Sequence, residues 1–548
     1  MTKADGMGNP ADPGKPTAMD YAALGSILLL GAAVRLWGIR WGLPDETHLF
    51  SYHPDEFHSL RGALSLAAGD PNPHFFNYGS LYLYLVAIAC NWHAAVIGGA
   101  DLLTALLKGN TAHAEMAAWV LDARLVVVLC ALATVHVSWL TGRQLGGNRG
   151  GLVSAGLMAV MPLHALNSHY ATVDVPQSLF ILLCLYFAVR LVSGITLRDC
   201  IWAGIAAGLA ASVKYNGALV LLAPVLAVLI APKDAQAVSP PVWKSIPAML
   251  GAAFGAFALT SPYVFLAWPE AWEHIRFEIE HMRVGESPWQ DMYPNGWLFH
   301  LHVTVFLAAL TLLLCRGRSP AAMAPAAVFA LMWFLMIGAA GVRYARYEMP
   351  LEVCAPVLAA GLAVWFANRR TAVGAAVIAA FALCLFLSIN RCLVLSAPDP
   401  RDRMLEIIKT QVPEDETLAL IWEPWFNVAP VDYCNGGAAL RSNPLFARFK
   451  RPVRELLVVG LDAAKLEEAQ PYAVLTSEFD LPAGAARVSK PHEAVQQALA
   501  ARKLTEIGPE PVRPIEMPPA RDRSDMHYAD PIQQLWILQD RSAPAGDG

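Results

Sequence analysis

Charged residues are scarce in this sequence. They make up 16% of its 548 residues, whereas hydrophobic residues make up 56%. Soluble globular proteins average about a quarter charged residues, so the composition excludes an ordinary soluble domain. Apolar stretches recur from Tyr21 to Ile389, and several reach the ~20 residues that a helix needs to cross a bilayer. The sequence therefore predicts a polytopic membrane protein.

Other absences narrow the class further. The formal net charge of -5 leaves no basic excess, which argues against nucleic-acid binding. The nine cysteines stand singly and form no CxxC pair, so neither a disulfide framework nor a thiolate metal site is expected. No repeat of fixed period is present.

The apolar runs predict a mainly α-helical transmembrane bundle of about 11–13 spans. The candidate spans are Tyr21–Trp37, Trp119–Leu140, Gly151–Asn167, Val175–Val192, Ile201–Val213, Ala218–Ala231, Ile246–Leu266, Trp297–Cys315, Ala321–Gly338, Met349–Asn368 and Ala372–Ile389. Residues 1–20 are polar and predict a disordered cytoplasmic tail. Residues 21–392 then form the membrane domain, with a large outer loop at 38–115.

The composition changes after Ile389. Between 398 and 541, strand-length apolar runs such as "TLALIW", "RELLVVGL" and "YAVLTSEF" alternate with helical patterns such as "HEAVQQALAARKL". Alternation of these two periods is typical of a small α/β domain. We predict an extramembrane α/β domain at the C-terminus.

Charge in the loops predicts the topology, because short loops rich in Lys and Arg mark the cytoplasmic side. Five such loops carry Arg143 and Arg149, Arg198, Lys233 and Lys244, Arg316 and Arg318, and Arg369 and Arg370. If these are cytoplasmic, segments 168–174, 214–217, 267–296 and 339–348 face outward. Placing 51–60 outside as well requires that Leu81–Ile97 does not cross, or that another crossing exists nearby. We favour a re-entrant or surface-lying helix at Leu81–Ile97, although Arg35 and Arg40 at the outer end of the first span argue mildly against this orientation.

Two acids, Asp55 and Glu56, stand in "SYHPDEFHSL", shortly after the first span. Solvated loop carboxylates without a role are the common alternative. Here the pair is framed by aromatic and apolar residues, and acids are otherwise sparse in outward loops of this length. The sequence predicts three elements after this pair: an amphipathic helix, a proline-broken turn and an aromatic-rich helix. Such a loop is expected to cover the outer end of the bundle, as a roof, rather than serve as a simple connection.

Three further segments on the predicted outer side carry polar groups. In "YATVDVPQ", Asp174 is either an N-cap followed by proline inside the helix or a second functional acid. Lys214, in "SVKYNG", lies between two short apolar helices, where a lysine must snorkel or find an anion. In "GVRYARYEMP", Arg343 and Arg346 interleave with Tyr344 and Tyr347.

Paired arginines suit a phosphate, which a guanidinium grips through two donors. Interfacial anchoring by Arg and Tyr is the alternative, but cations on the outer side run against the charge rule.

Histidines at positions 48, 53 and 58 lie five residues apart, which matches neither the i,i+3 nor the i,i+4 spacing of one helix face. The pattern is therefore no specific signal for a metal site. Taken together, acids and cations at one face suit a lipid-linked phosphate donor and a hydroxyl acceptor.

The motifs "HPDE", "FNYGSLYLYL", "YATVDVP", "SVKYNG" and "RYARYEMPLEVCAP" occur in this order. In this respect the chain, from about Tyr21 to Ile389, resembles the GT-C-fold, polyprenyl-phosphate-dependent glycosyltransferases. Within them it is most similar to the group that includes protein O-mannosyltransferases and the lipid A aminoarabinose transferase.

The resemblance implies roles for individual residues. Asp55 would be the base or acceptor-orienting acid with Glu56 beside it, and Asp174 the second-loop acid. The donor phosphate would lie against Lys214, Arg343, Arg346, Tyr344 and Tyr347. Substrate or loop positions would be His53, His58, His169, Asn77 and Tyr78. This sequence departs from the family pattern at two places. The family often has an arginine a few residues before the second-loop acid, and here the nearest such residue is His169. It often has another arginine after the acidic pair, and here Phe57 and His58 follow, so the family's sugar and acceptor recognition does not carry over to these positions.

The resemblance implies an inverting transfer of a sugar from a polyprenyl-phosphate donor to a hydroxyl of a protein, lipid or glycan. No cofactor is required by it, and it leaves a divalent metal open, with no metal ligands assigned. It places the enzyme in the cell envelope, in the bacterial inner membrane, and the charge of the loops predicts that the site and the C-terminal domain lie outside. A secondary transporter is the main alternative, but it would place ionisable residues near the midplane in two related halves. A membrane-anchored binding protein would need neither the acids nor the cations.

Overall fold

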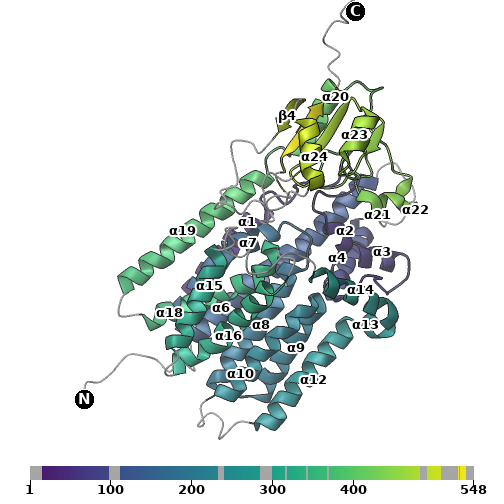
Figure 1. Cartoon of the computed structure of the whole chain (residues 1–548). Coiled ribbons are helices and arrows are strands. Elements are labelled where there is room, and N and C mark those ends of the chain that lie inside the picture. Colours follow the sequence, from purple (N-terminus) through teal and green to yellow (C-terminus); the bar gives the residue numbers. More distant parts are fainter. Residues whose placement is uncertain are drawn as a thin grey trace, which may run out of the picture.

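The computed structural model describes residues 15–97, 112–231, 240–283, 299–314, 318–340, 344–366, 370–481, 490–500, 502–507, 529 and 531–538. A bundle of helices makes up most of the chain, and a small α/β unit lies at one end of the bundle (Figure 1). The predicted fold class is therefore confirmed: the protein is mainly helical, and a sheet is present in the C-terminal region.

The described helices of the bundle, in chain order, are α1 (Ala18–Leu36), α2 (Glu56–Ser59), α3 (Arg61–Ala67), α4 (Leu81–Ile97), α6 (Ala112–Ala159), α7 (Pro162–Asn167), α8 (Asp174–Ser193), α9 (Leu197–Val213), η1 (Tyr215–Leu221), α10 (Leu222–Ile230), α12 (Val242–Thr260), α13 (Tyr263–Leu266), α14 (Trp268–His281), α15 (Phe299–Leu314), α16 (Arg318–Gly338), η2 (Ala345–Glu348), α17 (Met349–Glu352), α18 (Cys354–Trp365) and α19 (Arg370–Leu395). Helix α6 contains a kink, since Gly146 and Gly147 leave helical geometry. Helices α2, α3, α4 and α14 lie at the end of the bundle nearest the C-terminal unit (Figure 1).

Seven helical stretches of the described chain are long and apolar enough to cross a membrane: Ala18–Leu36, Ala112–Ala159, Asp174–Ser193, Val242–Thr260, Ala321–Gly338, Ala345–Trp365 and Thr371–Gln411. Shorter apolar helices occur at Leu81–Val96, Tyr215–Ile230 and Thr304–Leu314. These helices support a multi-pass membrane protein. The total number of spans and the course of Leu81–Ile97 relative to the bilayer stay predictions.

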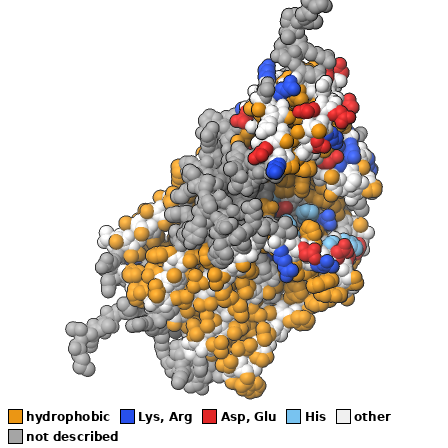
Figure 2. All heavy atoms as spheres, in the orientation of Figure 1, with side chains coloured by type: hydrophobic (Ala, Val, Ile, Leu, Met, Phe, Trp, Pro, Cys, Tyr) orange, Lys and Arg blue, Asp and Glu red, His pale blue; other side chains and the backbone are white. Residues whose placement is uncertain are grey.

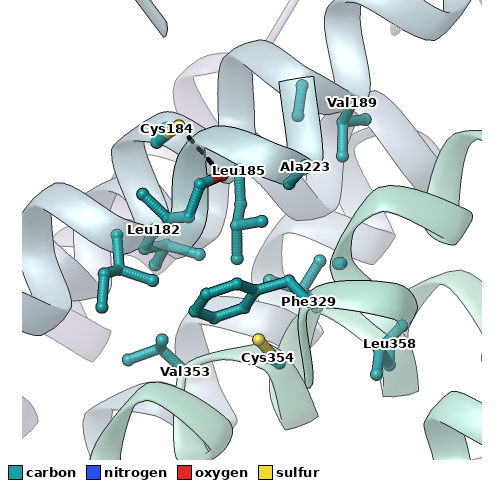
Figure 3. Close-up of a cluster of buried hydrophobic side chains, with 14 of the residues drawn as sticks. Leu182, Cys184, Leu185, Val189, Ala223, Phe329, Val353, Cys354 and Leu358 are labelled. Carbon is teal, nitrogen blue, oxygen red and sulfur yellow. Dashed lines mark hydrogen bonds between the residues drawn. The ribbon is translucent and has the colours of Figure 1, made fainter. Parts of the chain in front are cut away.

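The core of the bundle surrounds α8, which packs against α6, α9, α10, α16 and α17. Figure 3 shows Phe329 of α16 between Leu182 and Leu185 of α8 on one side and Val353 and Cys354 on the other. By contrast, α12 and α19 turn many large apolar side chains outward. Apolar side chains cover most of the visible helical part, whereas charged side chains gather on the C-terminal unit and in the band below it (Figure 2). This distribution is expected when lipid surrounds the bundle.

Two predicted boundaries differ from the structure. The predicted span Gly151–Asn167 is interrupted, because α6 ends at Ala159 and Pro162 begins the short helix α7. Proline has no N–H for the preceding turn and so favours a new helix start. The predicted outward loop at 267–296 contains helix α14, an amphipathic helix with Trp268 and Trp272 stacked on an exposed face.

The C-terminal unit, Asp399 to Leu538, is called the C-terminal domain below. It contains α20 (Pro400–Gln411), β1 (Leu418–Leu420), α21 (Gly437–Ser442), α22 (Pro444–Ala447), β2 (Leu456–Val458), α23 (Ala463–Ala469), β3 (Ala473–Ser477), α24 (Lys490–Leu499), β4 (Lys503–Ile507) and β5 (Gln533–Ile537). The strand order is β2-β1-β3-β5-β4, with β1 parallel to β2 and β3, and β5 antiparallel to its neighbours. Helix α20 covers one face of the sheet, and α23 and α24 cover the other.

Helices α9 and α12 pack closely because glycines lie between them. A Cβ added at Gly204 would come within 2.2 Å of the Met249 carbonyl oxygen, and one at Gly208 within 2.2 Å of the Ala253 carbonyl oxygen. The pair is a small-xxx-small motif, which lets membrane helices approach each other.

We therefore expect Gly208→Val to lower the apparent Tm in detergent, because overpacking a tight contact costs about 1–3 kcal/mol. The matched control is Gly255→Val on α12, where an added Cβ meets no atom within 4 Å. Equal Tm values for the two variants would contradict a close α9–α12 contact.

Candidate functional site

Asp55 stands directly before α2 at the end of the bundle below the C-terminal domain. Its backbone N–H donates to Nδ1 of His53 at 3.2 Å, and its carboxylate does not cap its own helix. Instead, Oδ2 accepts a hydrogen bond from Nη2 of Arg346 at 3.0 Å. The Asp55 side chain is 28% exposed, so a second molecule can reach this carboxylate.

Asp174 and Lys214 form a second ion pair. Asp174 begins α8, and its Oδ1 accepts a hydrogen bond from Nζ of Lys214 at 2.8 Å. The N-cap position is held by Val173 and has no side-chain capping bond, so capping does not explain the acid at 174. Lys214 follows α9 in extended backbone, and its side chain reaches Asp174 at the start of α8.

Arg346 connects the two pairs. Its Nε lies 3.9 Å from Oδ2 of Asp174, while Nη2 binds Asp55. Its guanidinium carbon lies 4.2 Å from the ring centre of Tyr344, and Nζ of Lys214 lies 4.4 Å from the ring centre of Tyr347. Cation–π contacts of this length hold both cations over aromatic faces. The four charged groups that the sequence placed on one side thus form one network.

Among the described residues, the network joins two carboxylates to two cations. An anion that binds Lys214 and Arg346 must therefore compete with Asp55 and Asp174. Since a phosphate is a strong hydrogen-bond acceptor for a guanidinium, it can take over donors of Arg346 and leave the Asp55 carboxylate available.

Asp55 is ionised in this setting. Burial acts to raise its pKa, but neighbouring positive charge, Arg346 foremost, outweighs burial and holds the pKa of Asp55 below its ordinary value. A lowered pKa keeps the carboxylate able to accept a proton at neutral pH.

Glu56 points away from Asp55 into the protein. Its two oxygens accept hydrogen bonds from Nε and Nη2 of Arg124 at 2.7 and 2.8 Å, and Oε1 also accepts the N–H of Ala171 at 2.7 Å. Burial opposes ionisation here too, but the Arg124 charge outweighs it and lowers the pKa of Glu56. Both side chains are fully buried, so these contacts favour a structural task for Glu56.

Arg124 is a functional neighbour that the sequence reasoning passed over. Besides Glu56, it donates through Nη1 to the carbonyl oxygens of Ile39 and Trp41 at 2.6 and 2.7 Å. It is a charged residue inside the predicted span Trp119–Leu140, and an ionisable residue within a membrane segment marks a functional site by default. That signal was present in the sequence.

The histidines have separate surroundings. Buried His53 receives the Asp55 N–H and packs against the Tyr170 ring, and burial lowers the pKa of His53 to about 4. His58 stacks on Phe75 with ring centres 5.0 Å apart. Each ring nitrogen of His169 lies 2.9 Å from a backbone carbonyl oxygen, so this residue supports the α7–α8 turn.

Asn77 and Tyr78 belong to the loop before α4. Asn77 donates through Nδ2 to Oε1 of Glu278 on α14 at 2.6 Å, which ties the loop to that helix. The ring of Tyr78 lies 5.7 Å from Nζ of Lys214, and burial raises the Tyr78 pKa, so the phenol stays neutral beside the network. Arg343 lies outside the described residues. Within the described ranges, no group of three or more His, Cys, Asp or Glu side chains could hold a metal ion.

Residues 117–268 match the family described as dolichyl-phosphate-mannose-protein mannosyltransferase. The matched segment contains Arg124, Asp174 and Lys214. The predicted resemblance to polyprenyl-phosphate-dependent glycosyltransferases is therefore confirmed. None of the curated protein sequences compared with the chain matches it.

Several solved structures are similar in outline. ArnT from Cupriavidus metallidurans bound to undecaprenyl phosphate has a TM-score of 0.48 at 13% identity, over 87% of this chain and 96% of that chain. The oligosaccharyltransferase of Archaeoglobus fulgidus, tethered with an acceptor peptide, has a TM-score of 0.46 at 11% identity, over 85% and 70%. The S. cerevisiae Pmt1-Pmt2 complex bound to the sugar donor has a TM-score of 0.34 at 16% identity, over 47% and 35%.

The buried pair predicts a large effect of removing one partner. Arg124→Leu leaves the Glu56 charge buried without its main partner, which costs about 3–5 kcal/mol of stability. We expect a clear fall in the apparent Tm in detergent. The double variant Glu56→Leu with Arg124→Leu should recover part of that loss, because no uncompensated charge then remains. A double variant less stable than Arg124→Leu alone would contradict the stranded-charge account.

Proposed function

We propose that the protein transfers a sugar from a polyprenyl-phosphate donor to an acceptor hydroxyl, with Asp55 as the base. The observation that carries this proposal is the Asp55–Arg346–Asp174–Lys214 network at one end of an apolar bundle. The family match of residues 117–268 supports the donor class. A lipid-linked phosphate would keep its chain against the apolar helices and its charge near Arg346 and Lys214.

The reaction is a single displacement. The acceptor oxygen attacks the anomeric carbon, its proton passes to a carboxylate oxygen of Asp55, and the bond from that carbon to the phosphate oxygen breaks. The polyprenyl phosphate leaves with the bonding electrons, and Arg346 and Lys214 balance its charge. Attack opposite the leaving group inverts the anomeric configuration.

Asp174 and Glu56 have supporting tasks in this scheme. Asp174 holds Lys214 in place before the donor arrives. Glu56 fixes the start of α2 through Arg124, so we propose a positioning role for it rather than a chemical one. The two side-chain cations supply the charge that a metal ion would otherwise provide, and we expect transfer to persist in the presence of EDTA.

We further propose that the site and the C-terminal domain face the outer side of a bacterial inner membrane. The charge of the loops supports this orientation, because the positive-inside rule assigns the five basic loops to the cytoplasmic side.

Transfer can be measured in membranes with radiolabelled sugars on a panel of polyprenyl-phosphate donors. Asp55→Asn should lower the transfer rate about 100-fold or more, since general-base catalysis contributes ~10²–10⁴-fold. The control is Asp45→Asn, the same change at an exposed carboxylate of the same loop, whose described side-chain contacts are the local ones to Thr47 and His48. Equal rates for Asp55→Asn and wild type would refute the base assignment. Solute uptake without transfer from any donor would favour a secondary transporter.

The pairing with Arg346 predicts a shift in the pH profile. In the wild type the pKa of Asp55 lies below its ordinary value of about 3.9, so the base is protonated only at quite acidic pH. Arg346→Gln removes the main opposing charge, so the pKa rises and the acidic limb of the rate profile should move to higher pH. Arg276→Gln, which breaks an exposed Arg–Glu pair on α14, is the control and should leave the limb in place. An unmoved limb in Arg346→Gln would mean that Asp55 does not set it.

A further inference from the structure

The segment that leads to Asp55 is bonded to the C-terminal domain. The N–H of Leu49 donates to the Tyr433 carbonyl oxygen at 2.8 Å. The side chain of Asn435 accepts the N–H of Phe50 at 3.0 Å and donates to the carbonyl oxygen of Phe50 at 3.2 Å. Asn435 is buried, so both backbone groups of Phe50 are satisfied by one side chain from the other domain.

A second contact holds Tyr52. The guanidinium carbon of Arg401 lies 3.8 Å from the centre of the Tyr52 ring, and both of these side chains are fully buried. The Tyr52 hydroxyl donates to Asp402 on the same helix, α20. Arg401 is itself fixed by two hydrogen bonds to Asp399, at 2.8 and 2.7 Å. The cation is thus preorganised over the ring, where desolvation strengthens a cation–π contact.

A third contact lies on the far side of Asp55. Phe446 of α22 meets Phe50 edge-to-face at 5.2 Å between ring centres and Phe57 of α2 at 5.4 Å. Phe50 and Phe57 are 5.2 Å apart, so the three rings form one cluster. Figure 1 shows α21 and α22 where the C-terminal domain meets the end of the bundle that carries α2.

Asp55 is therefore bracketed. The C-terminal domain contacts Phe50 and Tyr52 before it and Phe57 after it, while the network across the bundle contacts it through Arg346. We propose that the C-terminal domain is a positioning element of the transferase site, in which Phe446 and Arg401 hold the start of α2 so that the Asp55 carboxylate faces Arg346 and the reacting centre. This inference rests on the proposed function, because the effect it predicts is on transfer.

The contact between the C-terminal domain and the Asp55 segment matters because the reaction requires a short distance between the base and the acceptor hydroxyl. A base must lie within hydrogen-bond reach of the acceptor proton, and a displacement of about 1 Å can cost on the order of 100-fold in rate. Because α2 has only four residues, its position depends on the groups that it contacts. The buried Glu56–Arg124 pair holds its inner side, and the C-terminal domain holds its outer side.

The test compares three full-length variants in lipid nanodiscs. Phe446→Ala removes the ring that meets Phe50 and Phe57, and Phe446→Leu keeps an apolar side chain of similar size. The control is Leu499→Ala on α24, which opens a cavity in the same domain at a fully buried position away from the Asp55 segment. Hydrogen exchange of residues 49–60 reports the loop, and transfer kinetics report the site.

For Phe446→Ala we expect faster exchange at residues 49–60 and a fall in kcat on the order of 10–100-fold, with donor KM changed much less. Phe446→Leu should recover most of kcat, and Leu499→Ala should leave both readouts near wild type. Equal losses in Phe446→Ala and Leu499→Ala would overturn the proposal, since general destabilisation would then explain both. Unchanged exchange, or faster exchange with unchanged kcat, would overturn it too. A wild type that transfers no sugar would refute the proposed function, and the exchange data alone would then decide whether the domain holds the loop.

Discussion

The buried ion pair between Glu56 and Arg124 is the interaction on which the site depends. It joins α2 to α6, and through Ala171 it joins both to the turn before α8. Arg124 also donates hydrogen bonds to the carbonyl oxygens of Ile39 and Trp41, shortly after the end of α1. Four segments of the chain, at residues 39–41, α2, α6 and Ala171, therefore meet at this one ion pair. A buried pair of this kind is costly to desolvate and strongly destabilising to break, so its value here lies in specifying one arrangement.

The chemistry follows from where this arrangement places the remaining charges. The helices of the bundle end beneath the C-terminal domain, and their connecting turns carry Asp55, Asp174, Lys214 and Arg346 to a common point. Away from bulk water, opposite charges at this point interact more strongly than on an open surface. The cations also lie over the rings of Tyr344 and Tyr347, which can keep them in place when a phosphate replaces their carboxylate partners.

Much of the fold was predictable from local pattern. The apolar runs indicated the helices, and the runs containing Leu418, Leu456 and Ala473 became β1, β2 and β3 as expected from their strand-like patterns. Helix α14 was missed because its apolar residues lie on one face of an otherwise charged segment, so no long hydrophobic run announces it. Arg35 argued against the proposed orientation of the first span. Its side chain is buried and forms hydrogen bonds with the Ala159 carbonyl oxygen and the His164 ring, so its charge carries little information about which side of the membrane this end of the span faces.

The sequence by itself determined the membrane class, the α/β character of the C-terminal unit and the set of charged residues worth considering, because hydrophobic period and charge are local properties. The family resemblance already favoured Asp55 over Glu56 as the base, but only the tertiary structure showed what each of the two carboxylates contacts. Adjacent residues at the start of a helix point about 100° apart. Asp55 meets Arg346, which lies 291 positions away in the sequence, and Glu56 meets Arg124, which lies 68 positions away. The hold of the C-terminal domain on the Asp55 segment was likewise beyond sequence reasoning, since cation–π and edge-to-face contacts leave no spacing pattern along the chain.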